Sequence, residues 1–230
     1  MDAFKIIWKS IRTYYNELIP LVLMSVVSIL VSFFIIPAPF ALAGLWSVAR
    51  RAGEGRSTEW RDFWDGIRRY GPRNALNALF VVFVTFLIVT NVWFYNQPDI
   101  SPVSPKVAVW LTVFWLGVTL LWIAVLFYWL AFQLEMEEPK FWVSLRNSLF
   151  FALLNPIPTL VFLILSGLLA ALAVVVPPLI FLYPGFIATL STTAVKSLLV
   201  PILEQQEELE QASQEATMNV ESAGNKGVRT

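Results

Sequence analysis

The sequence predicts an all-α, polytopic transmembrane helix bundle with amphipathic interfacial helices. The 230 residues are 57% hydrophobic and only 14% charged, with a mean hydropathy of +0.68, whereas soluble domains carry roughly 25% charged residues. Charged residues are also absent from four long runs, over residues 18–49, 74–98, 107–134 and 147–195. Each run exceeds the ~20 residues that a spanning helix needs, and its composition suits a helix better than a membrane barrel strand.

Prolines divide these runs into spans. Paired prolines between apolar stretches indicate tight turns, because proline lacks the N–H that a helix interior needs. Pro37 with Pro39, and Pro177 with Pro178, mark such hairpin turns. We therefore expect about six spans, over residues 18–36, 39–52, 75–95, 107–133, 157–176 and 178–199. The alternative is five spans, with one kinked helix over residues 18–49.

The second span is short. At about 1.5 Å per residue it covers only ~20 Å of a ~30 Å hydrocarbon core, so it is either a half-span or a re-entrant segment. The last span contains Pro184 and Gly185, which predict a kink in its interior. The alternative there is a discontinuous helix that exposes backbone groups to a solute.

The polar residues within the spans are mainly Ser and Thr, as in "ATLSTTAV" over residues 188–195. Small and hydroxyl residues let transmembrane helices approach closely, and we expect the same of Gly44 and Gly167. A polar-lined pathway is the functional alternative to this packing interpretation.

An aromatic and basic element occurs three times. It is WKSIRTY from Trp8, WDGIRRY from Trp64 and WVSLRNS from Trp142, each with an arginine four residues after the tryptophan. In the first two copies the apolar residues fall on one helix face with basic residues beside it, which is typical of an interfacial helix. Tryptophan suits the headgroup layer, and arginine can reach lipid phosphate. The candidates for anchoring or partner docking are Trp8, Arg12, Trp60, Phe63, Trp64, Arg68, Trp142 and Arg146.

Local details of the second copy are also predicted. Ser57 or Thr58 is expected to cap its helix, over residues 58–70, and Asp65 and Arg69 are expected to form an i, i+4 ion pair.

The three copies divide the chain into three hairpin units. Each copy precedes an apolar segment, so copies on one membrane surface require an even number of spans between them. The units are about 1–52, 57–135 and 139–200, within an integral membrane domain over residues 1–200. The Lys and Arg distribution places both termini in the cytoplasm. Residues 201–230 contain six glutamates against Lys226 and Arg229, which predicts an acidic, largely disordered tail.

The residue types restrict the chemistry. The chain contains no Cys and no His, which excludes disulfides, thiolate nucleophiles, imidazole catalysis and the usual zinc sites. The carboxylates, including Glu135, lie outside the spans without a nucleophile motif, so we expect solvated faces and no catalytic residue, cofactor or metal. No span has an ionisable group in its middle, which disfavours an ion-coupled carrier working alone. Residues 50–73 contain seven arginines and four acidic residues, a net +3, so nucleic acid binding is not expected.

The segments "PAPFALAGLWSVARRAGEG" and "WRDFWDGIRRY" follow a basic and aromatic N-terminal helix. This layout, over roughly residues 1–200, resembles the YesL family of bacterial integral membrane proteins. The resemblance implies a multi-pass protein of the bacterial plasma (inner) membrane, without an established activity, that is often considered an accessory to carbohydrate uptake. It also implies structural roles for the residues that match the family pattern, Pro37, Ala41, Phe63, Trp64 and Arg68.

The expected function is therefore non-enzymatic. We expect an accessory or scaffold for a carbohydrate-related transport assembly, with a small-solute permease or channel as the alternative. Its expected partners are the lipid bilayer and either a membrane transporter subunit or a second copy of the chain.

Overall fold

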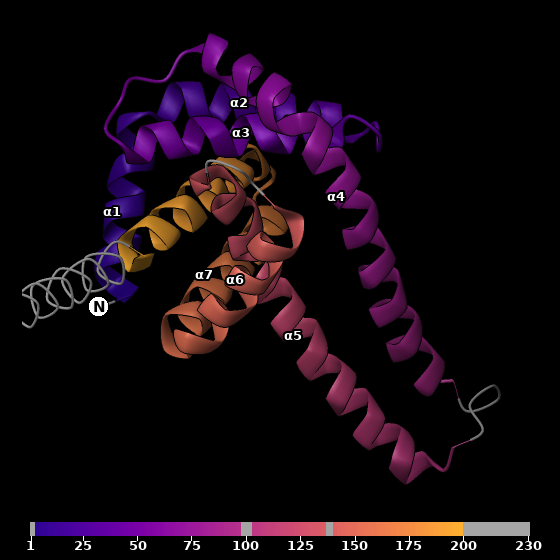
Figure 1. Cartoon of the computed structure of the whole chain (residues 1–230). Helices are drawn as coiled ribbons and strands as arrows, with labels where there is room; N and C mark the ends of the chain where they lie inside the picture. Colours follow the sequence, from indigo (N-terminus) through magenta and orange to yellow (C-terminus); the bar gives the residue numbers. More distant parts are fainter. Residues whose placement is uncertain (1–2, 98–102, 137–139, 200–230) are drawn as a thin grey trace, which may run out of the picture. The chain divides into compact units, whose positions relative to one another are not determined.

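The protein is all-helical over residues 3–97, 103–136 and 140–199, which are the residues that our computed structural model describes. These ranges contain no β-strand, which confirms the predicted fold class. The helices are α1 (Ala3–Asn16), α2 (Leu18–Ser32), α3 (Ala38–Gly53), α4 (Trp60–Tyr95), α5 (Pro105–Glu135), α6 (Phe141–Leu154), α7 (Pro156–Val175) and the 3₁₀ helix η1 (Pro177–Phe181) (Figure 1). A further helix covers residues 183–199.

The chain divides into two compact units, Met1–Thr193 and Ala194–Thr230. Within the second unit, residues 194–199 are helical, and the predicted acidic tail lies outside the described residues. All contacts reported below belong to the first unit.

Three of the described helices, α4, α5 and α7, are long and apolar enough to cross a membrane. A fourth candidate is the pair α1 and α2, which meet at a bend of 89°. The other predicted spans are shorter than a membrane crossing, since α2 has 15 residues and α3 has 16, or about 23 Å each. By length and composition the described residues thus contain three or four candidate spans, and the count of six stays a prediction.

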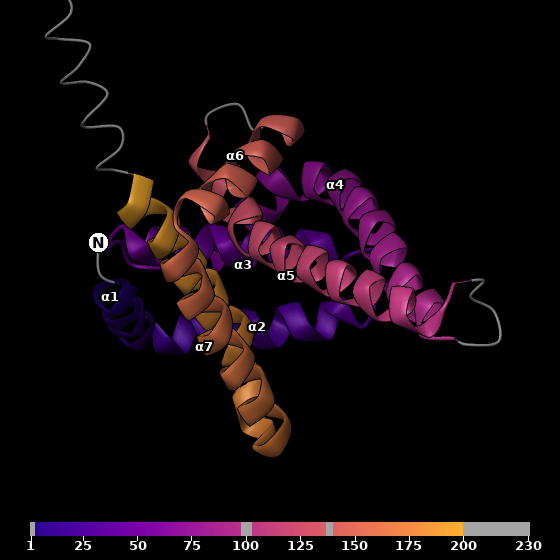
Figure 2. The same cartoon turned by 90° about the horizontal axis from the view of Figure 1, so that it is seen from below.

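The hairpin turn predicted at Pro37 and Pro39 is confirmed. α2 ends at Ser32, and α3 begins beyond Pro37 with Pro39 in its first turn, where an N–H has no helical partner to lose. The two helices lie side by side (Figure 2). The apolar residues 33–36 at the tip of this hairpin are highly exposed, as expected of a segment that enters a membrane.

The prediction for Pro177 and Pro178 is confirmed, but the interior kink at Pro184 is wrong. α7 ends at Val175, and η1 begins at Pro177. The next helix begins at residue 183, so Pro184 occupies its first turn and interrupts nothing. Gly185 instead allows close packing, because a Cβ there would lie 2.5 Å from the Ser25 hydroxyl oxygen and 3.1 Å from the Tyr14 ring.

The predicted surface helix over residues 58–70 and the span over residues 75–95 are one helix, α4. It continues through Pro72, because contacts with the α2–α3 hairpin hold it on both sides of the proline. Phe63 is fully buried before it, and the Asn74 amide donates to the Pro39 carbonyl after it. Proline inside a helix bends it rather than ends it under such constraints. Figure 1 shows α4 changing direction as it leaves α3.

α3 and α4 cross with their backbones in contact. A Cβ on Gly66 would lie 2.6 Å from the Ser47 Cβ and 3.1 Å from the Gly44 Cα. A Cβ on Gly44 would lie 2.9 Å from the Phe63 carbonyl oxygen. The prediction of close packing at Gly44 is therefore confirmed. The same prediction for Gly167 is wrong, because among the described residues no side chain or neighbouring backbone approaches within 4 Å of a Cβ built there.

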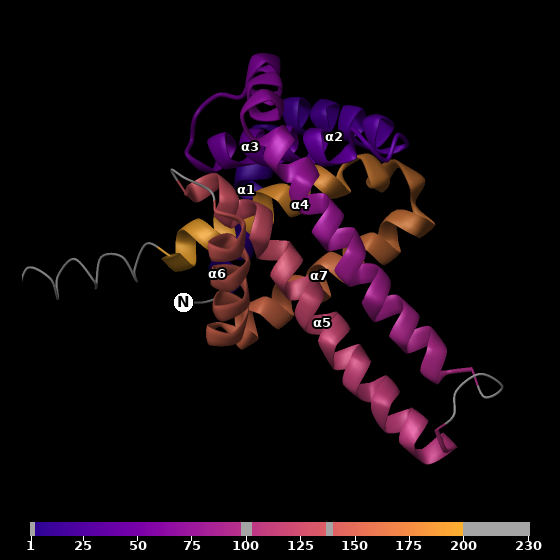
Figure 3. The same ribbon diagram turned by 45° about the vertical axis from the view of Figure 1, so that its right-hand side comes forward.

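α5, α6 and α7 pack together through aromatic rings. α6 lies beside α5 (Figure 3), with the Phe141 ring 5.8 Å from the Trp129 ring and the Phe151 ring 5.1 Å from the Tyr128 ring. The Tyr128 and Thr159 hydroxyls are 3.0 Å apart and join α5 to α7. Edge-to-face rings at such distances add to the packing energy of the buried surface.

Replacing Gly66 with alanine should destabilise the protein. The new methyl would overlap the Ser47 Cβ, and overpacking of this kind costs about 1–3 kcal/mol, which exceeds the ~1 kcal/mol gain in helix propensity. Gly117 is the matched control, since a Cβ there meets nothing within 4 Å, and Gly117→Ala should be neutral or stabilising. Chemical unfolding in detergent, followed by circular dichroism, measures both changes. A stabilised Gly66→Ala protein would contradict the backbone contact.

Candidate functional site

A charged cavity lies between the C-terminal end of α3 and the first turns of α4. Its volume is ≈ 310 Å³, and we call it the α3–α4 cavity. It is lined by Ser47, Arg50, Arg51, Glu54, Arg56, Asp62, Asp65, Gly66, Arg69 and Tyr70. It lies directly behind the glycine contact of the two helices, because Ser47 and Gly66 belong to both.

Local sequence explains why the chain turns here. Arg50 and Arg51 occupy the last turn of α3, where cations favour the helix dipole. Gly55 follows with a φ of 72°, a left-handed conformation that glycine adopts without strain. The turn then leads into α4, whose first turn contains Asp62.

The start of α4 is capped by a different residue from those predicted. Glu59 is the N-cap residue, and its backbone N–H donates to the Asp62 carboxylate at 2.9 Å. The Thr58 hydroxyl instead donates to the Glu17 carboxylate at 2.6 Å. The expectation that Ser57 or Thr58 caps this helix is therefore wrong, because Thr58 is engaged by the α1–α2 junction.

Ion pairs hold the cavity wall. The Arg51 Nη1 atom lies 3.1 Å from the Asp62 Oδ1 atom and thereby joins α3 to α4. Glu54 lies 3.3 Å from the Arg50 guanidinium and 3.5 Å from that of Arg56. Since several of these side chains are partly exposed, each pair contributes about 1 kcal/mol or less. Together they fix the guanidinium groups in place.

The predicted ion pair between Asp65 and Arg69 is not formed. The Asp65 carboxylate lies 3.9 Å from the Arg61 Nε atom instead. The Arg69 guanidinium lies over the Tyr70 ring, 5.4 Å from its centroid, within the range of a cation–π contact. Arg69 makes no ion pair with any residue that the structure describes.

Arg50 also connects α3 to α5. Its Nη1 atom donates to the Leu134 carbonyl, and its Nε atom lies 3.8 Å from the Glu135 carboxylate. The carbonyls in the last turn of a helix have no helical partner, so this arginine satisfies one of them. Glu135 is thus engaged by Arg50, contrary to its expected place on a solvated face.

The lining of this cavity suits the binding of a charged group rather than the catalysis of a covalent reaction. Its carboxylates face arginines, and guanidinium groups are planar donors that suit phosphate or carboxylate oxygens. An anionic group is therefore the ligand that the α3–α4 cavity fits best.

The predicted anchor residues lie on three different helices. Trp8 on α1, Trp60 and Trp64 on α4, and Trp142 on α6 are exposed by 70%, 46%, 45% and 68%. The arginines of the three copies, Arg12, Arg68 and Arg146, are exposed as well. Phe63 is the exception, because its side chain is fully buried. An anchoring or docking role for Phe63 is therefore wrong; it packs against α3.

In each of the three copies of the aromatic and basic element, the corresponding side of the helix faces the protein. Two residues after each tryptophan comes a small buried residue, which is Ser10, Gly66 or Ser144. The small residue faces the protein, while tryptophan and arginine face outward. The apolar face of the first copy, on α1, lies only partly against the protein, because Ile11 is exposed and Tyr14 is buried.

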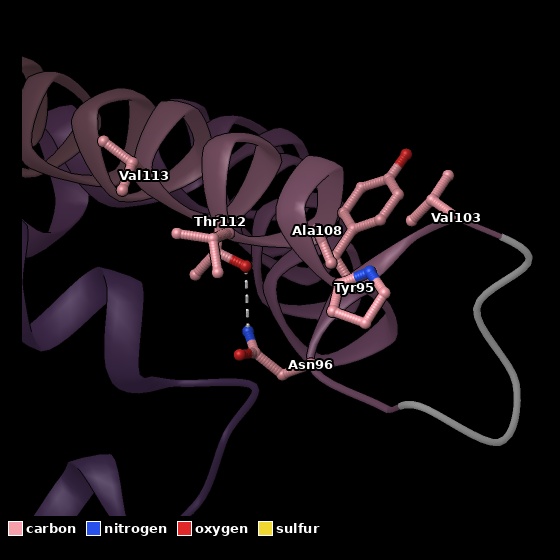
Figure 4. A pocket seen from close by; sticks show the side chains of 8 residues that line it. Tyr95, Asn96, Val103, Ala108, Thr112 and Val113 are labelled. Atoms are coloured by element: carbon pink, nitrogen blue, oxygen red, sulfur yellow. Dashed lines mark hydrogen bonds between the residues drawn. The ribbon is translucent and has the colours of Figure 1, made fainter.

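A second cavity, of ≈ 340 Å³, lies between the C-terminal end of α4 and the first turns of α5. Its polar groups face each other: Figure 4 shows the Asn96 amide directed at the Thr112 hydroxyl, which it meets at 3.2 Å. The remaining lining is mainly apolar, with Val109 and Val113 among its residues. This cavity therefore offers few free hydrogen-bonding groups.

Sequence reasoning missed the α3–α4 cavity. Of the seven arginines in residues 50–73, the sequence pattern predicts only Arg68 as a candidate, and Arg68 does not line this cavity. A usable signal was present, because acidic residues are interleaved with these arginines at Glu54, Asp62 and Asp65. Their pairing depends on the crossing of α3 and α4, which local sequence does not specify.

Comparison with known proteins supports the membrane assignment. The profile of a family described as "Predicted integral membrane protein (DUF2189)" matches residues 26–103. The matched region contains α3, α4 and every residue that lines the α3–α4 cavity. No curated protein and no solved structure matches the chain. The chain is an integral membrane protein similar to this family, and the resemblance to YesL proteins stays a prediction.

Replacing Arg50 with alanine should destabilise the protein by about 1–2 kcal/mol. The change removes the hydrogen bond to Leu134 and leaves Glu135 without its cation, and hydrogen bonds to charged groups are worth ~1.5–3 kcal/mol before allowance for solvent exposure. Arg56→Ala is the control, because Arg56 is 67% exposed and pairs with Glu54 alone among the described residues. Its effect should be within ~0.5 kcal/mol. Unfolding in detergent measures both, and equal effects would contradict the bridging role of Arg50.

Proposed function

We propose that this protein is a non-enzymatic scaffold of the bacterial inner membrane that assists a transport assembly. The observation that carries the proposal is the common orientation of its three tryptophan and arginine elements. Each buries a small residue against its own protein and presents Trp and Arg outward. Trp and Arg are the residues most enriched at binding hot spots, so these faces suit a protein partner as well as headgroups.

The hydroxyl groups of the helices favour this proposal over a permease. The Ser25, Ser166 and Thr189 hydroxyls donate to carbonyls one turn earlier in their own helices, at 2.7, 2.7 and 2.9 Å. A hydroxyl that is satisfied in this way leaves no free donor for a solute. In "ATLSTTAV" the Thr189 and Thr192 hydroxyls are satisfied within the helix, which supports helix packing over a polar pathway. The buried Thr193 hydroxyl of the same stretch has no hydrogen-bond partner among the described residues.

The proposed partner and its side of the membrane are inferred from the sequence. A carbohydrate-related transporter is the partner that the YesL resemblance implies, and cytoplasmic termini follow from the distribution of Lys and Arg. In this arrangement the outward faces of α1, α4 and α6 meet a transporter subunit on the cytoplasmic side of the membrane.

Replacing Trp64 with alanine and Arg68 with glutamine should release the partner without unfolding the protein. Both side chains are exposed, and the Trp64 ring meets the rings of Trp60 and Phe63 on its own helix, so the variant should stay folded, which circular dichroism checks. The measurement is co-purification of the full chain from its native host in mild detergent, with the bound subunit quantified by mass spectrometry. We expect at least a fivefold loss of that subunit, since hot-spot residues contribute about 1 kcal/mol or more each.

Trp93→Ala provides the matched control. Trp93 is also on α4 and is 53% exposed, but Gln97 rather than arginine stands four residues after it. This variant should retain the subunit. Equal recovery with all variants would contradict docking through the tryptophan and arginine elements. Solute flux in proteoliposomes that contain only this protein would favour the permease instead.

A further inference from the structure

We propose that the α3–α4 cavity binds the phosphate of an anionic phospholipid headgroup. This site is separate from the outward tryptophan and arginine faces and goes beyond the scaffold function. Its position fits a lipid, because both helices change from apolar to charged at this point. α3 has no charged residue before Arg50, and α4 has none from Asn74 to its end at Tyr95. The cavity is therefore at the level of the headgroups when these apolar segments are in the membrane.

The charge of the lining selects an anion. Four arginines (Arg50, Arg51, Arg56 and Arg69) and three carboxylates (Glu54, Asp62 and Asp65) line the cavity, which leaves a net charge of +1. The excess cation is Arg69, which makes no ion pair with the described residues. A phosphodiester carries one negative charge, so its binding would neutralise the cavity.

Hydrogen-bond donors remain for the phosphate oxygens. The Arg51 Nε atom is buried and has no hydrogen-bond partner among the described residues, although its Nη1 atom is paired with Asp62. A bound phosphate oxygen would supply the missing partner of this donor. Arg69 adds a guanidinium that is held over the Tyr70 ring. Planar guanidinium groups bind phosphate oxygens through paired hydrogen bonds.

The surroundings favour a lipid over free phosphate. Leu76 is seven residues after Arg69, or about two turns along nearly the same helix face. Leu76 and Leu79 are both 70% exposed, so an acyl chain that extended along α4 from a phosphate in the cavity would meet apolar side chains. Trp64 is exposed at the start of the same helix, as is usual at the headgroup level.

The test titrates short-chain dihexanoyl phosphatidylglycerol into the detergent-solubilised full chain by isothermal calorimetry. Arg69→Gln should weaken binding about tenfold, since it removes one charge-assisted contact. Arg73→Gln is the control: Arg73 is an exposed arginine of the same helix, bears the same charge and lies outside the cavity lining. Its affinity should match the wild type. Arg69→Lys, which keeps the charge, should recover part of the loss, and circular dichroism checks that each variant is helical.

Two further titrations distinguish the sources of the anion. Inorganic phosphate and dihexanoyl phosphatidylcholine should each bind at least about tenfold more weakly than phosphatidylglycerol, because one lacks acyl chains and the other has no net charge. Equal affinity for inorganic phosphate would replace the lipid with a free anion and overturn the proposal. Equal weakening by Arg73→Gln and Arg69→Gln would indicate diffuse attraction and would also overturn it, as would undetectable binding of phosphatidylglycerol. Loss of the protein partner with retained lipid binding would affect the scaffold proposal alone.

Discussion

The contact between the backbones of α3 and α4 is the constraint on which the described structure depends. Only glycine at positions 44 and 66 permits it, because a Cβ at either position would lie within 3 Å of atoms on the opposite helix. The same contact buries Phe63 and holds Arg51 within 3.1 Å of Asp62. Small residues have this role wherever helices pack in lipid, since close approach rather than water exclusion drives association there. The charged cavity is a consequence of this geometry.

The features that the sequence predicts well are those that depend on local chemistry. Apolar runs give helices, and Pro37 with Pro39 and Pro177 with Pro178 give turns, because a missing N–H and a fixed φ act on the nearest residues. Tertiary contacts decide the rest. α4 continues through Pro72 because packing on both sides holds it. Phe63 is buried and Trp64 exposed, although both are aromatic, because the apolar pattern does not say whether a face meets lipid or protein.

Ion pairs in the α3–α4 cavity could not be predicted for a related reason. Asp65 can reach an arginine four residues before it or four after it, and the two spacings are nearly equal in sequence terms. In the structure it lies near Arg61, which leaves Arg69 for the cavity. The partner of Arg50 at Leu134 is 84 residues away along the chain. The candidate site thus depends on contacts between α3, α4 and α5, while the outward position of Trp64 follows from a repeated local pattern. Scaffold docking and lipid binding would use neighbouring positions of α4, since Trp64 and Arg68 lie within five residues of Arg69.

A double-mutant cycle of Ser47→Gly and Gly66→Ala tests the backbone contact most directly. The methyl of the alanine would overlap the Ser47 Cβ, and Ser47→Gly removes that atom. If the helices touch here, the double variant recovers much of the stability that Gly66→Ala loses, with a coupling free energy of about 1 kcal/mol or more. The cycle subtracts the helix-propensity cost of each single change. Strictly additive free energies of unfolding would show that the helices do not meet at Gly66 and would contradict the contact from which the cavity and the orientation of α4 follow.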